Sequence, residues 1–265
     1  MDRPALSRLW PLIGSCVLLF LLGVSPWGLW ERDEGRYADV AREMLARGDY
    51  VTPRIDGAVF LDKPPLVYWV TAASLSIWGG GETGARFGQL LFAAGILLVT
   101  RRLGQLLFDR RRANIALMVL ASSLGFFTSS HLLTLDLGLT FFVSLALCCF
   151  LSGWRAGQGG RRAYLGMFAA VAGGVLSKGP IAGFLVAAPI ACYLTLRREW
   201  RRAGELPWVA GTLLFLAISA PWYVAVALIN PEFLSYFFVH ENLARFGTTV
   251  HHHTGPWYYY VAVAA

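Results

Sequence analysis

The chain has 265 residues, of which 56% are hydrophobic, 14% are aromatic and 15% are charged, and its formal net charge is +7. Soluble domains rarely reach this apolar content, and repeated apolar stretches of about 20 residues indicate membrane-spanning helices. The positive charge does not predict nucleic-acid binding, because the lysines and arginines lie in short clusters between apolar stretches rather than along one surface. The four cysteines lie inside apolar stretches without zinc-ligand spacing, and they predict neither disulfides nor a cysteine-based metal site.

A long polar block, residues 31–69, interrupts the apolar sequence. The apolar stretch 10–29 precedes this block and predicts a first membrane span. Arg3 and Arg8 lie before that span, which predicts a cytoplasmic N-terminus and an extracytoplasmic polar block. We expect residues 30–80 to form a periplasmic first loop that carries interfacial helices.

Two helices are predicted within this loop. Over 34–47 the apolar residues follow the i, i+3, i+4 spacing of an amphipathic helix, and Gly48 ends the pattern. Pro64 and Pro65 predict the start of a second helix over 66–78, which three glycines terminate. Because a span needs about 20 residues, we expect both helices to lie on the membrane surface. The apolar stripe of the first helix comprises Tyr37, Val40, Ala41, Met44 and Leu45.

Further apolar stretches predict membrane spans at 85–107, 113–133, 137–154, 164–176, 181–196 and 207–228. If 66–78 is interfacial, every arginine cluster between these spans falls on one side of the membrane, as the positive-inside rule requires. The sequence therefore predicts an all-α integral membrane protein with seven spans and the start of an eighth at residue 257. We expect residues 1–265 to be the N-terminal transmembrane domain of a longer protein.

Charged and polar side chains collect on the outer face that this topology defines. Asp136 and Lys178 each lie alone in an apolar setting, where a charge costs about 2.5–3.5 kcal/mol, so we expect them to be paired or functional. Carboxylates suit acid–base chemistry, whereas lysine and arginine bind phosphate. A lipid phosphate that carries a transferable group would use both. The set comprises Asp33, Glu34, Arg36, Tyr37, Asp62, Lys63, Asp136, Lys178, His240, Glu241, Asn242, Arg245 and His251–His253.

Four sequence blocks resemble a known family of membrane glycosyltransferases. The blocks are DEGRYADVAREML, RIDGAVFLDKPPLVYW, HLLTLDLGLTFF and LSKGPIAG, which begin at residues 33, 54, 131 and 176. They are similar to the GT-C class, and most of all to the aminoarabinose transferases of lipid A modification and their ArnT-like relatives. The resemblance implies a bundle of transmembrane helices in the bacterial inner membrane with a periplasmic active site.

The same resemblance implies the reaction and the roles of the site residues. A sugar such as aminoarabinose would pass from undecaprenyl phosphate to lipid A or to another glycan or protein acceptor, with inversion at the anomeric carbon. Asp33 and Asp136 would be the catalytic carboxylates. Asp62 and His240 would hold one divalent metal ion such as zinc. The residues implied to bind the carrier phosphate and the substrate are Arg36, Tyr37, Lys63, Lys178 and Arg245.

This chain departs from the family pattern at three positions. Gly35 stands where proline is usual, Asp62 replaces a glutamate and so shortens one metal ligand, and Phe60 stands where tyrosine is common.

The same residues also fit other interpretations. Asp33 and Arg36 also fit a surface i, i+3 pair, Asp136 fits a helix N-cap, and Lys178 fits a lysine that reaches the lipid headgroups. For the whole protein, a protein O-mannosyltransferase is the nearest alternative, and a polytopic transporter or lipid flippase is the alternative from another class. Transporters usually place ionisable groups near the membrane midplane in repeated halves, whereas here the charges gather at one face and no repeat is visible.

Overall fold

The computed structural model describes residues 20, 28–29 and 32–237. Four predicted features therefore lie outside the described residues: the span start at 257, His240, Arg245 and the span over 10–29, of which only residues 20, 28 and 29 are described. The described part is almost entirely helical. Its helices are α3 (Arg32–Arg47), α4 (Leu66–Trp78), α5 (Glu82–Leu107), α6 (Arg110–Ala121), α7 (Leu124–His131), α8 (Leu135–Ala156), α9 (Arg161–Lys178), α10 (Ile181–Arg197) and α11 (Trp208–Ile229).

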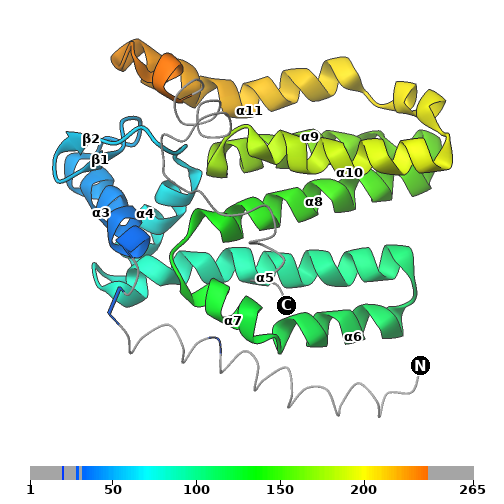
Figure 1. Ribbon diagram of the computed structural model, residues 1–265, viewed down its shortest axis with the longest axis horizontal. Helices are drawn as coiled ribbons and strands as arrows, with labels where there is room; N and C mark the ends of the chain where they lie inside the picture. Colours follow the sequence, from blue (N-terminus) through cyan, green and yellow to red (C-terminus); the bar gives the residue numbers. More distant parts are fainter. Residues whose placement is uncertain (1–19, 21–27, 30–31, 238–265) are drawn as a thin grey trace, which may run out of the picture.

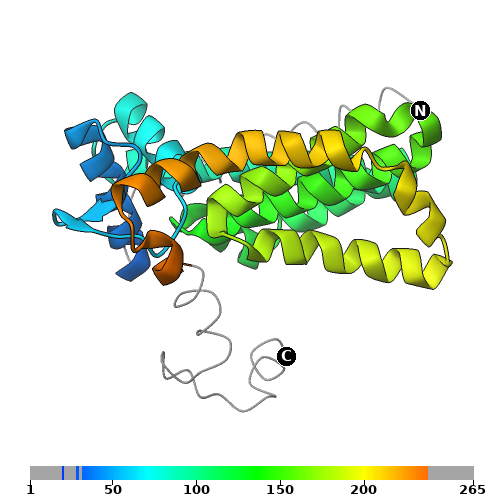
Figure 2. The same ribbon diagram turned by 90° about the horizontal axis from the view of Figure 1, so that it is seen from above.

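Long helices form a bundle, and shorter elements gather at one of its ends (Figures 1 and 2). α3, α4 and a hairpin of β1 (Arg54–Ile55) and β2 (Ala58–Val59) lie at that end. The α5–α6 connection and the 3₁₀ turns η1 (Gly157–Gly160) and η2 (Trp200–Glu205) lie at the other end. The arginine clusters flank these three connections. The clusters therefore lie at the end of the bundle opposite the polar first loop.

Three helices of the described part, α5, α8 and α11, are long and apolar enough to cross a membrane. α6 and α7 would together provide a fourth span, but they are bent by 61° relative to each other. The predicted continuous span over 113–133 is thus broken at Ser122 and Ser123. The Ser123 hydroxyl accepts a hydrogen bond from the Phe126 backbone N–H at 3.2 Å and so caps a new helix, as serine does at helix starts.

The two helices of the first loop have the bounds that the sequence predicts to within two residues. α4 follows the two prolines and ends at Gly79, whose φ of +91° suits glycine. The apolar stripe of α3 lies in one hydrophobic cluster with side chains of α4 and α5, and Val40, Ala41 and Met44 are almost fully buried. This stripe therefore packs against protein and not against lipid. β1 and β2 pair antiparallel around Asp56 and Gly57, both at positive φ, as in a two-residue hairpin turn.

Glycines face aromatic rings at two contacts between α8 and α9. A Cβ atom added to Gly173 would lie 2.4 Å from Cε1 of Phe142, and one added to Gly153 would lie 2.8 Å from Cε1 of Tyr164. Both distances are shorter than carbon atoms tolerate. The absence of a side chain at these two positions lets the two helices approach each other, and Gly173 lies five residues before Lys178, the last residue of α9.

Candidate active site

The first candidate residues lie at the start of α3, at the first-loop end of the bundle. Nη1 of Arg36 donates a hydrogen bond to Oδ1 of Asp33 at 3.2 Å, and the Asp33 side chain is 50% exposed. The Arg36 guanidinium also lies 5.8 Å from the centre of the Phe60 ring, which comes from the segment after β2. The i, i+3 pair predicted from the sequence is present, and it leaves the carboxylate accessible from outside.

Tyr37 lies within electrostatic range of three candidate carboxylates. Its side chain is mostly buried, and its ring centre lies 5.8 Å from that of Tyr68. Burial, together with the negative charges of Asp33, Asp136 and Asp62, raises the pKa of Tyr37 from 10 to about 12. Three carboxylates from separate segments thus act on one phenol. Because this phenol stays protonated at neutral pH, it offers a hydrogen-bond donor beside the three acids.

Asp136 and Lys178 form an ion pair although 42 positions separate them in the sequence. Asp136 lies in the first turn of α8, and Lys178 is the last residue of α9. Nζ of Lys178 donates to Oδ1 of Asp136, and the two side chains are 29% and 68% exposed, respectively. Each charge also suits its helix end, an acid at the N-terminus and a base at the C-terminus. The N-cap of α8 is Thr134, so Asp136 is not the cap.

Asp62 and Lys63 lie in the segment that leads into α4. The hydroxyl of Tyr236, just beyond α11, donates a hydrogen bond to Oδ1 of Asp62 at 2.8 Å. Lys63 is half-buried and follows directly. The segment that follows α11 therefore contacts the segment that holds two candidate residues. Among the described residues, no group of three His, Cys, Asp or Glu side chains forms a metal site.

The first loop is also attached to the bundle by tryptophan side chains. Nε1 of Trp69 donates to the backbone oxygen of Tyr50 at 2.8 Å, and Nε1 of Trp222 donates to that of Val51 at 3.0 Å. One donor belongs to α4 and the other to α11. The chain between α3 and β1 is thereby held against both helices.

Sequence reasoning missed the ion pair between Glu34 and Arg86. Nε and Nη2 of Arg86 donate to the two Glu34 oxygens at 3.0 and 2.9 Å, and the Leu133 backbone N–H donates to Glu34 Oε1 at 2.8 Å. Both side chains are almost fully buried. Glu34 adjoins Asp33, and Leu133 precedes Asp136 by three residues. One buried carboxylate thus links the two segments that carry the predicted catalytic acids.

Comparisons with known proteins fit this arrangement. Residues 62–225 match the family model described as dolichyl-phosphate-mannose-protein mannosyltransferase. The chain is 30% identical over 255 residues to the undecaprenyl phosphate-alpha-4-amino-4-deoxy-L-arabinose arabinosyl transferase of Edwardsiella ictaluri, with 93% of this chain and 45% of that protein covered. It is 32% identical over 259 residues to the protein of the same name from Pseudomonas aeruginosa PAO1, with 94% and 46% covered.

The same family is found among solved structures. The crystal structure of ArnT from Cupriavidus metallidurans bound to undecaprenyl phosphate matches with a TM-score of 0.92 at 28% identity, covering 97% of this chain and 48% of that one. The apo structure of the same protein matches with a TM-score of 0.89 at 27% identity, covering 98% and 48%. The chain spans just under half the length of these relatives. The predicted GT-C-type fold and the resemblance to the aminoarabinose transferases are confirmed.

The extent of these matches decides which family the chain represents. The family model covers well over half of the chain, from Asp62 through most of α11. The structural matches extend over nearly all of it, including the first loop with its charged site. The chain belongs to the dolichyl-phosphate-mannose-protein mannosyltransferase family.

Proposed function

We propose that this protein is an inner-membrane glycosyltransferase that moves a sugar from undecaprenyl phosphate to lipid A. One observation carries the proposal. Tyr37, Asp33, Asp62 and Asp136, with the cations Arg36 and Lys178, gather at one end of a bundle that matches a transferase structure bound to undecaprenyl phosphate. Carboxylates beside cations suit a reaction in which a sugar leaves a lipid phosphate.

The cations would act on the leaving phosphate. As the bond between the anomeric carbon and the phosphate oxygen breaks, negative charge grows on that oxygen. Arg36 and Lys63 on the first loop would neutralise it, joined by Arg245. Removing one such stabilising group typically lowers the rate about 10²–10³-fold. Tyr37, whose pKa lies near 12, would donate a hydrogen bond to a phosphate or sugar oxygen without becoming an anion.

Asp33 would act at the sugar. If the acceptor is a phosphate of lipid A, the nucleophile is already anionic, and Asp33 orients the sugar or offsets positive charge at the anomeric carbon. If the acceptor is a hydroxyl, Asp33 takes its proton. In either case the acceptor oxygen bonds to the anomeric carbon while the bond to the carrier phosphate breaks. This single displacement inverts the configuration at that carbon.

A divalent metal ion extends the proposal. Asp62 uses Oδ1 to accept from Tyr236, which leaves Oδ2 for a metal, and His240 would supply an imidazole nitrogen. Zinc accepts this pair of ligand types. When bound, the ion would add positive charge beside the carrier phosphate. Metal content of the purified protein, measured for wild type and Asp62→Asn, tests this part separately from activity.

The arginine clusters support one orientation of the protein in the membrane. They lie at the end of the bundle opposite the candidate site, and arginine collects on the cytoplasmic side of bacterial membrane proteins. The candidate site would then face the periplasm, where lipid A is reachable. The matched family's description names proteins as acceptors, and this makes a periplasmic protein the second candidate acceptor.

Mass spectrometry of lipid A tests the proposal. A host without its own aminoarabinose transferase would express the full-length gene as wild type, Asp33→Asn or Glu43→Gln. Glu43 lies on the same helix but pairs with Arg47 outside the site, so its variant is a matched control. We expect the aminoarabinose mass increment with wild type and Glu43→Gln and its loss with Asp33→Asn. A membrane-inserted wild type that adds no increment would exclude lipid A, and retention of the increment in Asp33→Asn would exclude the catalytic role.

A further inference from the structure

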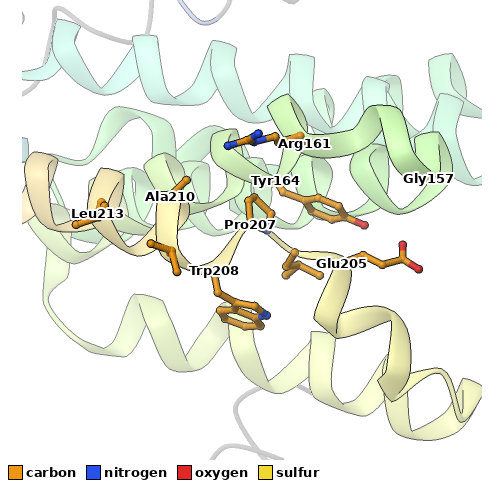
Figure 3. Close-up of a pocket in the computed structure, with 10 residues that line it drawn as sticks. Gly157, Arg161, Tyr164, Glu205, Pro207, Trp208, Ala210 and Leu213 are labelled. Carbon is orange, nitrogen blue, oxygen red and sulfur yellow. The ribbon is translucent and has the colours of Figure 1, made fainter.

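A pocket of about 850 Å³ opens at the arginine-rich end of the bundle (Figure 3). One wall comes from η1 and the start of α9, with Arg161 and Tyr164, and the other comes from the turn before α11 and its first two turns, from Glu205 to Leu213. α11 has 22 residues and is therefore about 33 Å long, close to the thickness of a bilayer core. The pocket and the candidate active site thus lie at opposite faces of the membrane that the helices cross.

The α11 wall of the pocket is apolar and exposed. Trp208, Val209 and Leu213 are 52%, 76% and 62% exposed, although all three are large hydrophobic residues. They begin a helix that is apolar enough to span a membrane. Side chains of this kind in a bilayer contact acyl chains, and tryptophan favours the level of the headgroups. An occupant of the pocket therefore meets a hydrocarbon surface on this side.

The opposite wall carries a positive charge that the protein does not neutralise. The side chain of Arg161 is exposed and has no hydrogen-bond or ion-pair partner within the described part of the chain. The acid of the pocket, Glu205, lies 3.8 Å from Nε of Arg202. Figure 3 shows the Arg161 guanidinium and the Glu205 carboxylate pointing to opposite sides of the pocket. Arg161 is thus available to a ligand.

The surroundings of the pocket are positive as well. Four other exposed arginines of this end have no side-chain partner among residues 32–237. Arginine binds phosphate oxygens through its planar fork of N–H donors, and basic clusters at a membrane surface attract anionic lipids. These four residues are Arg155, Arg162, Arg198 and Arg201.

We propose that this pocket binds an anionic phospholipid of the leaflet opposite the candidate active site, with its phosphodiester on Arg161 and an acyl chain along Ala210 and Leu213. Charge complementarity favours an anionic headgroup over a zwitterionic one, because arginines outnumber glutamates at the arginine-rich end of the bundle. The apolar wall selects a lipid over a soluble phosphate, because a soluble ion gains nothing from exposed hydrocarbon. This site is independent of the proposed transferase activity.

Native mass spectrometry of the full-length protein in detergent tests the site. The protein would be titrated with phosphatidylglycerol, with phosphatidylethanolamine and with glycerol 3-phosphate. Arg161→Gln removes the proposed phosphate contact. Arg110→Gln is the matched control, because Arg110 is an exposed arginine at the same end, on α6, without a partner in the described chain and outside the pocket. Ala210→Trp fills the apolar side.

We expect wild type and Arg110→Gln each to retain one phosphatidylglycerol molecule. Arg161→Gln should bind this lipid about fivefold more weakly. Ala210→Trp should also lose the lipid while the headgroup arginine remains. Three results would overturn the proposal: equal retention of phosphatidylethanolamine, equal weakening by Arg110→Gln, or competition by glycerol 3-phosphate at the concentration at which the lipid saturates.

Discussion

Glu34 offers the strongest test of how the candidate site is held. Replacing it with leucine leaves the Arg86 guanidinium, which is 4% exposed, without its carboxylate, and the Leu133 N–H without its acceptor. A charge left unpaired in the interior costs about 3–5 kcal/mol. We therefore expect Glu34→Leu to lower the free energy of unfolding by about that amount. Glu43→Leu on the same helix breaks a more exposed pair with Arg47, which is worth about 0.5 kcal/mol or less.

The assay is SDS-induced unfolding of the full-length protein in detergent micelles, followed by far-UV circular dichroism. A third protein, the double variant Glu34→Leu with Arg86→Met, removes both charges and leaves an apolar pair. It should be more stable than Glu34→Leu alone, even though it carries one substitution more. Equal stability of Glu34→Leu and Glu43→Leu would refute the reasoning, and so would a double variant less stable than the single one.

Three further predictions concern the site and its support. Lys178→Ala should lower the free energy of unfolding by at most about 1 kcal/mol, because its pair with Asp136 is partly exposed. The same variant should lower the proposed transfer to lipid A at least tenfold in a mass-spectrometric assay. The pKa of Tyr37 is raised from 10 to about 12 on folding, so the phenol loses its proton first in the unfolded chain, and the free energy of unfolding falls between pH 10 and 12. Tyr37→Phe should reduce this loss of stability when the melting temperature is measured against pH. A loss as large as that of wild type would contradict the assignment. Gly84→Ala should lower the free energy of unfolding by about 1–3 kcal/mol, because the added Cβ would lie 2.0 Å from the backbone oxygen of Gly79. Gly80→Ala is the control: its Cβ would meet nothing within 4 Å, so the thermal midpoint should not change.

The helices of the first loop could be predicted because local signals define them. Two prolines before Leu66 and three glycines after Trp78 mark both ends of α4, and the 3.6-residue period marks α3. The break between α6 and α7 was missed because the apolar content of 113–133 is continuous. The serines at 122 and 123 were the available signal, since serine caps helices more readily than it continues them.

The site could be predicted in its residues but only partly in its contacts. A charge in an apolar stretch indicates that Asp136 and Lys178 need a partner, but their mutual pairing depends on how α8 and α9 turn back on each other. Glu34 was placed on the right face without a role, and Arg86 was absorbed into the apolar span that begins at residue 85. An arginine one residue inside a span is the signal that could have identified it.

The glycine contacts between α8 and α9 have a consequence for how this hairpin is assembled. Lipid tails are as apolar as leucine, so two helices in a bilayer do not associate by excluding their solvent. Gly173 and Gly153 provide instead a recess into which Phe142 and Tyr164 fit. Attraction of this kind depends on shape and persists when detergent replaces lipid. Asp136 and Lys178 therefore belong to two helices, α8 and α9, whose separation is set by steric fit. This separation does not depend on the membrane around the helices.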